Sequence, residues 1–75
     1  MRTATLETGG GRVRPRCAYD ARLVASLRDA IPWRSLRWDV RARCWETRPK
    51  WRDRLLEVLE LHQYRVEIQP PEIAA

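Results

Sequence analysis

The chain has little of what metal sites and catalytic sites are built from. Its 75 residues include one histidine and two cysteines. Cys17, Cys44 and His62 are too few to supply the four protein ligands of a structural zinc site within one chain. No spacing of carboxylates, or of a serine or cysteine with the histidine, suggests a catalytic pair. We therefore expect a protein that is not an enzyme and that uses no metal and no cofactor.

Long apolar runs are also missing. Residues 1–8 contain no apolar signal core, and no window approaches the roughly 18 apolar residues of a membrane span. The sequence thus predicts a cytoplasmic protein with no membrane partner. In that compartment both cysteines should be reduced, and we expect them to be small buried side chains. The glycines at 9–11 lack the lysine and hydroxyl of a phosphate-binding loop, so any ATP-driven step would belong to another protein.

Acidic residues are few, ten against fifteen basic ones, and the net charge is +5. The imbalance is local. Residues 33–54 carry eight basic against three acidic residues, residues 1–30 six against three, and residues 55–75 one against four. A basic front with an acidic end is typical of a molecule with one side that binds acidic partners such as nucleic acid. Fourteen of the fifteen basic residues are arginine, which a GC-rich genome would also produce.

Four tryptophans alternate with the cations of residues 33–54. Flat apolar rings among fixed positive charges are typical of surfaces that bind a polyanion and stack on its bases. A core position is the alternative for each ring. Trp38 is predicted on a strand and Trp51 on the apolar side of a helix, so we expect both in the core. The face of Trp45 depends on the hairpin register, and Trp33, in a loop, should be the most exposed.

Alternation of side chains predicts two N-terminal strands, residues 2–7 and 12–17, joined by the flexible glycines at 9–11. Pro15 cannot donate a hydrogen bond to a neighbouring strand, which predicts an edge strand or a bulge at this position. Three arginines recur at period two and should form a stripe on one sheet face: Arg12, Arg14 and Arg16.

A helix is predicted from Asp20 to Ile31, because apolar residues recur there at helical spacing and Pro32 ends the pattern. Asp20 suits the N-cap position. Tyr19 can pack on Val24 as a hydrophobic staple.

A second hairpin is predicted over residues 35–47. In its turn, Asp39 can accept a hydrogen bond from the backbone two residues on. A second helix is predicted to begin near Pro49. A last strand, residues 64–69, alternates apolar and polar side chains, and residues 70–75 should form a flexible tail.

The predicted order is β-β-α-β-β-α-β over one domain, residues 1–69. It indicates an α+β fold, with a small antiparallel-rich sheet of four to five strands and two helices packed on one face. One domain with a thin core is also what this length allows. An exposed edge of the first or second strand would offer a route to self-association, and the oligomeric state stays open.

The middle of the chain resembles the HARP-type module over a little more than half of its length. The matching features, followed by an amphipathic helix that reaches Leu61, are Tyr19–Asp20, Leu23–Val24, Leu27, Ile31–Pro32, Arg37–Trp38–Asp39 and Trp45. Two positions depart from the pattern. Trp33 stands where a glycine is common and Val40 where a proline is common, and both bear on loop shape more than on fold.

The resemblance implies a DNA-binding role. HARP modules are appended to annealing helicases of the SWI/SNF type, where they are associated with recognising branched DNA and with strand annealing. For this chain it implies the DNA-binding part without the motor, as in a small bacterial or phage protein that serves as an accessory subunit.

We therefore predict a non-catalytic module that binds single-stranded or branched DNA through phosphate contacts and serves a replication or repair complex. If the second hairpin packs beside the arginine stripe, seven arginines could merge into one patch. The candidate binding residues are Arg12, Arg14, Arg16, Trp33, Arg34, Arg37, Arg41, Arg43, Arg48 and Lys50. The alternative is a protein-interaction module whose basic face docks on an acidic partner enzyme and regulates or inhibits it. The sequence does not distinguish DNA from RNA.

Overall fold

The structure, a computed structural model, describes residues 2–69. Its elements are β1 (Arg2–Gly9), β2 (Arg12–Arg16), α1 (Ala21–Ala30), β3 (Arg37–Asp39), β4 (Cys44–Glu46), η1 (Pro49–Trp51), α2 (Arg52–Leu61) and β5 (Tyr64–Gln69). The predicted α+β order is confirmed, with a single 3-10 turn, η1, leading into α2 at the proline. The predicted tail, residues 70–75, lies outside the described residues.

The strands form two sheets, where one was predicted. β1 lies between β2, which is antiparallel to it, and β5, which is parallel, and β3 pairs only with β4. A single antiparallel bridge between Val13 and Thr47 joins the sheets, with N···O distances of 2.8 and 2.9 Å. Two residues further along β2, the next donor toward β4 would be Pro15, which has no N–H. The ladder therefore stops after one bridge, and the edge position predicted from Pro15 is confirmed.

Self-association through an edge of β1 is ruled out by this topology, because β1 pairs on both sides. The outer strands of the larger sheet are β2 and β5, and β2 meets the hairpin side only through the bridge between Val13 and Thr47.

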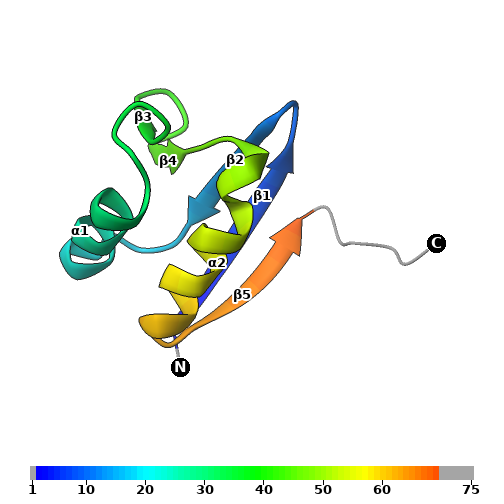
Figure 1. Cartoon of the computed structure of the whole chain (residues 1–75). Helices are drawn as coiled ribbons and strands as arrows, with labels where there is room; N and C mark the ends of the chain where they lie inside the picture. Colours follow the sequence, from blue (N-terminus) through cyan, green and yellow to red (C-terminus); the bar gives the residue numbers. More distant parts are fainter. Residues whose placement is uncertain (1, 70–75) are drawn as a thin grey trace.

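One hydrophobic core joins the larger sheet to both helices. α2 lies across a face of the β2-β1-β5 sheet, and α1 lies beside the sheet and packs against α2 (Figure 1). The largest fully buried side chains come from β1, β2, α1 with its C-cap residue, and α2: Leu6, Val13, Leu27, Ile31, Leu55 and Leu59. The hairpin β3–β4 lies beyond β2. Along β2, Val13 and Pro15 are buried, and the three arginines alternate with them on the other face of the strand.

Asp20 begins α1 as predicted and also ties three elements together. Its Oδ1 accepts hydrogen bonds from the N–H groups of Arg22 and Leu23, at 3.0 and 3.2 Å. Its Oδ2 accepts from Arg2 at 2.7 Å and from the Tyr64 hydroxyl at 2.9 Å. The Tyr64 hydrogen bond and then the backbone donors lower the pKa of Asp20. Tyr19 is 85% exposed, so the predicted staple is wrong.

The turn of the second hairpin decides where its tryptophans lie. Asp39 Oδ1 accepts from the N–H groups of Arg41 and Ala42, at 2.9 and 3.1 Å, as predicted. Arg43 takes a left-handed conformation with φ of 53°. The resulting register places Trp45 opposite Trp38, on the same side of the hairpin.

Two of the tryptophan predictions are confirmed and one is wrong. Trp33 is 79% exposed, as expected from its loop. Trp51 is partly buried against the core, as its predicted place on the apolar side of the second helix indicated, and Trp45 packs there too. Trp38 was expected in the core but is 46% exposed. The reason is that β3 is an outer strand with a neighbour on one side only.

Candidate nucleic-acid interface

Glu46 is a buried carboxylate on which three arginines converge. Its Oε2 lies 3.2 Å from Arg14 Nε and Nη2 and 3.8 Å from Arg12 Nη1, and its Oε1 lies 3.5 Å from Arg37 Nε. Arg14 also donates to Asp39 Oδ2 at 3.1 Å. Arg37 and Glu46 are paired across the hairpin, and the bridge between Val13 and Thr47 holds Glu46 next to β2. The arginines of β2 and β3 therefore meet at Glu46. The charge of Arg14 is thus largely taken up by the protein itself.

Asp39 holds its charge beside this cluster. The N–H of Ala42 and then that of Arg41 lower the pKa of Asp39, and Arg14 and Arg37 lower it further against the opposing effect of burial. The carboxylate is therefore ionised at neutral pH. It fixes both the hairpin turn and the position of Arg14.

Four arginines line a hollow of about 320 Å³ beside Glu46, and we call it the arginine hollow. They are Arg12, Arg34, Arg37 and Arg48. Ser35 and Thr47 complete the lining, and the Thr47 hydroxyl donates to the Ser35 carbonyl at 2.6 Å. Glu46 is the one carboxylate in the lining. Within residues 2–69, Arg34 and Arg48 form no ion pair, so the hollow keeps an excess of positive charge.

Trp33 is an exposed ring next to the arginine hollow. The Arg34 guanidinium lies over it, 5.2 Å from the ring centroid. Such a cation–π contact holds the arginine and the ring in a shared orientation. An aromatic face and a positive charge are thereby offered side by side.

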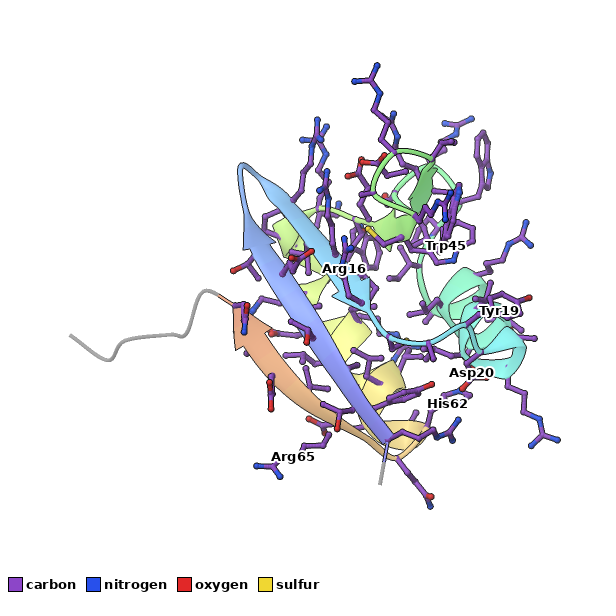
Figure 2. All side chains as sticks on the ribbon, turned by 180° about the vertical axis from the view of Figure 1, so that it is seen from behind. Arg16, Tyr19, Asp20, Trp45, His62 and Arg65 are labelled. Carbon is purple, nitrogen blue, oxygen red and sulfur yellow. The ribbon has the colours of Figure 1, made fainter. Side chains whose placement is uncertain are left out.

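A second depression lies between the hairpin and the segment that joins β2 to α1. We call it the aromatic groove, since Tyr19, Trp38 and Trp45 line it together with Arg16 and Arg43. Figure 2 shows Arg16, Trp45 and Tyr19 around this region, with Arg65 on the other side of the molecule beside β5.

The seven arginines that were predicted to form one patch do not lie together in the structure. Arg12, Arg34 and Arg37 meet in the hollow, and Arg14 lies between two carboxylates. Arg16 lies 3.3 Å from Glu7 and donates to Cys44 Sγ at 3.7 Å, at the aromatic groove with Arg43. Arg41 is exposed in the hairpin turn, and Lys50 lies over the Trp51 ring, 5.3 Å from its centroid. Acidic side chains on the same sheet face divide the basic surface into two parts.

The two cysteines line the aromatic groove. Cys44 is buried as predicted, whereas Cys17 is exposed, so the prediction that both are buried is wrong for Cys17. Partial shielding from water raises the pKa of the Cys17 thiol, although the residue as a whole is exposed. Burial also raises the pKa of Cys44, and it outweighs the opposing effect of the Arg16 guanidinium. Both thiols are protonated at neutral pH, and that part of the groove is uncharged.

Sequence reasoning missed Glu46 as the centre of the arginine cluster, and it missed Tyr19 as a wall of the groove. Alternation along β4 could have placed Glu46 on the same face as Arg37. Its contacts with β2, however, depend on the bridge between Val13 and Thr47, for which no local sequence signal exists. Tyr19 was assigned to helix capping.

Comparisons of the chain with protein-family models, curated proteins and solved structures find no match. The resemblance to HARP-type modules therefore stays a prediction. Over residues 2–69, no cluster of three or more histidine, cysteine or acidic side chains is suited to hold a metal ion. No helix in the same range is long and apolar enough to cross a membrane.

Proposed function

We propose that the protein is a non-catalytic module that binds single-stranded or branched DNA through its arginines, as an accessory to a replication or repair complex. The observation that carries the proposal is the arginine hollow. Four arginines, from β2, from β3 with the loop before it, and from the segment after β4, line it together with a single carboxylate. Like charges held this close repel each other, and a phosphate relieves that repulsion. Guanidinium groups also bind phosphate oxygens in a bidentate manner.

Trp33 supports a preference for unpaired bases. It is exposed, stands beside Arg34, and offers a ring on which a base of any identity can stack. Phosphate contacts carry no sequence information, so weak sequence preference is expected. A relation to HARP-type modules would point to the same substrates. Any motor activity would come from a protein partner.

A protein-interaction module is the second candidate, in which the basic face docks on an acidic partner enzyme and regulates it. The outer side of β5, a surface separate from the basic face, favours a protein partner. Among the described strands β5 pairs only with β1, so its other side offers backbone donors and acceptors to a partner strand.

A binding titration separates the two candidates. Fluorescence anisotropy would follow labelled single-stranded, duplex and forked DNA of equal length from about 50 to 200 mM salt. We expect binding at low salt that is tighter for the single-stranded and forked forms, and that weakens steeply as salt rises. Lack of binding at the lowest salt by the folded protein would contradict DNA binding. Pulldown of a protein that survives nuclease treatment would then support the second candidate.

A further inference from the structure

The aromatic groove leaves large rings open to water next to the proposed DNA-binding surface. Tyr19 is 85% exposed and Trp38 46%, and Trp45 forms the inner wall. Trp38 and Trp45 meet edge to face, with ring centroids 5.5 Å apart and an interplanar angle of 69°. Exposed apolar side chains that gather in one depression mark a binding site more often than scattered ones do.

The charges of the groove restrict what it can bind. Arg16 and Arg43 both line it, and Arg43 forms no ion pair within residues 2–69. Asp20 is the one carboxylate in the lining, and its oxygens already accept hydrogen bonds from Arg2, Tyr64 and the start of α1. A suitable ligand therefore has a flat, unsaturated ring and carries negative charge next to that ring.

The size of the groove fits one ring system. Its volume is about 200 Å³, and apolar cavities of about 150 Å³ bind benzene. A nucleobase presents a flat ring with two stacking faces, and in a strand it has a phosphate on either side.

A strand bound in the arginine hollow can reach the groove. Arg12 belongs to the hollow and Arg16 to the groove, and the two side chains point to the same side of β2. They are four positions apart along the strand, a distance of about 13 Å. This is the length of about four stacked nucleotides at ~3.4 Å each.

We propose that the aromatic groove receives one unstacked base of a bound single strand, while Arg16 and Arg43 contact the phosphates beside it. This inference rests on the proposed function, because it requires a strand along β2. It adds a second base-binding position, besides the exposed ring of Trp33, to a surface whose arginines contact phosphates.

The test compares two labelled probes of about ten units, a length within the range that small single-strand-binding folds cover. One is oligothymidine, and the other has the same sugar–phosphate backbone with abasic units, so both carry equal charge. The groove should make the wild-type protein bind oligothymidine about 5- to 150-fold more tightly, the range given by stacking of one base, in addition to any stacking on Trp33. Tyr19→Ala and Trp38→Ala should lose much of this preference, whereas both should keep the affinity for the abasic probe.

Leu61→Ala is the matched control, since Leu61 is exposed at the end of α2 and lies outside the groove. It should bind both probes as the wild type does. Thermal unfolding by circular dichroism checks that each variant folds. Trp38→Phe, which keeps a ring, should retain most of the preference and provides the comparison if Trp38→Ala unfolds.

Each outcome is decisive. Equal, salt-dependent binding of both probes by the wild type would overturn the base site and leave the proposed function standing. A preference that Tyr19→Ala and Trp38→Ala retain would also overturn it, because the base would then bind elsewhere. Lack of binding to either probe at low salt would overturn the proposed function itself.

Discussion

Among single residues, Glu46 has the greatest influence on the arginine cluster. Its side chain is buried and lies within 4 Å of three guanidinium groups. Arg12 and Arg37 are largely exposed, and such pairs contribute little to stability. Arg14 is mostly buried, so its hydrogen bonds to Glu46 and Asp39 contribute most.

We predict that Glu46→Gln lowers the free energy of unfolding by about 1–3 kcal/mol, because Arg14 loses a charged partner that water does not replace. Added inorganic phosphate should restore more stability to this variant than to the wild type, since an anion can take the place of the carboxylate. Urea unfolding with and without phosphate measures both effects. Glu67→Gln, at an exposed position on β5, is the control. Unchanged stability in Glu46→Gln would show that the carboxylate does not hold Arg14.

Tyr64 gives a prediction in pH. Burial, and then its hydrogen bond to Asp20, raise the pKa of Tyr64 to about 12. Because this lies above the ordinary value of about 10, the stability that Tyr64 contributes is complete below about pH 10 and is lost as pH rises through about 12. Tyr19→Phe leaves Tyr64 as the sole tyrosine, so tyrosinate absorbance can follow it alone. In the double variant Tyr19→Phe/Asp20→Asn, the pH midpoint of tyrosinate formation should be lower than in Tyr19→Phe. Equal midpoints in the two variants would contradict the hydrogen bond between Tyr64 and Asp20.

At the scale of elements, the turn between β3 and β4 carries a strained residue. Arg43 has a left-handed backbone, which costs a non-glycine residue about 1–2 kcal/mol. We predict that Arg43→Gly stabilises the fold by about 0.5–1 kcal/mol, after the greater freedom of glycine in the unfolded chain is counted. Arg41→Gly removes the same charge from the same turn without that strain, and it should destabilise. Urea midpoints that move the same way in both variants would contradict this explanation.

Elements with local signals could be predicted from the sequence, and pairings without them could not. The glycines at 10 and 11 have positive φ, Asp20 caps α1, and a proline opens the turn before α2, each as its residue type favours. The division into two sheets depends on the meeting of Val13 with Thr47, which are distant in sequence. Trp38 is exposed because β3 is an outer strand of the smaller sheet. The alternation of side chains along the strand cannot predict this position.

The candidate site shows the same limit. The ten candidate residues were chosen by charge and spacing, and four of the arginines meet in one hollow. The hairpin register determines which of these arginines form ion pairs with the protein's own carboxylates. Arg43 sets that register through a conformation that arginine seldom adopts.

At the scale of the whole molecule, the basic surface is local rather than uniform. The arginine hollow and the aromatic groove lie along β2 and the hairpin, while Arg22, Arg28 and Arg65 are exposed on α1 and β5. If net charge alone attracted DNA, these outlying arginines would matter as much as those of the hollow. The central claim is that the position of the arginines, and not the net charge, determines DNA binding.

The most direct test is the salt dependence of single-strand binding by two triple variants with the same net charge. One replaces Arg34, Arg37 and Arg48 of the hollow by alanine, and the other replaces Arg22, Arg28 and Arg65. Each phosphate contact adds about 0.7 to the slope of log affinity against log salt. We predict that the hollow variant loses about 2 from this slope and that the other variant keeps nearly all of it. Equal losses in the two variants would contradict a positioned phosphate site.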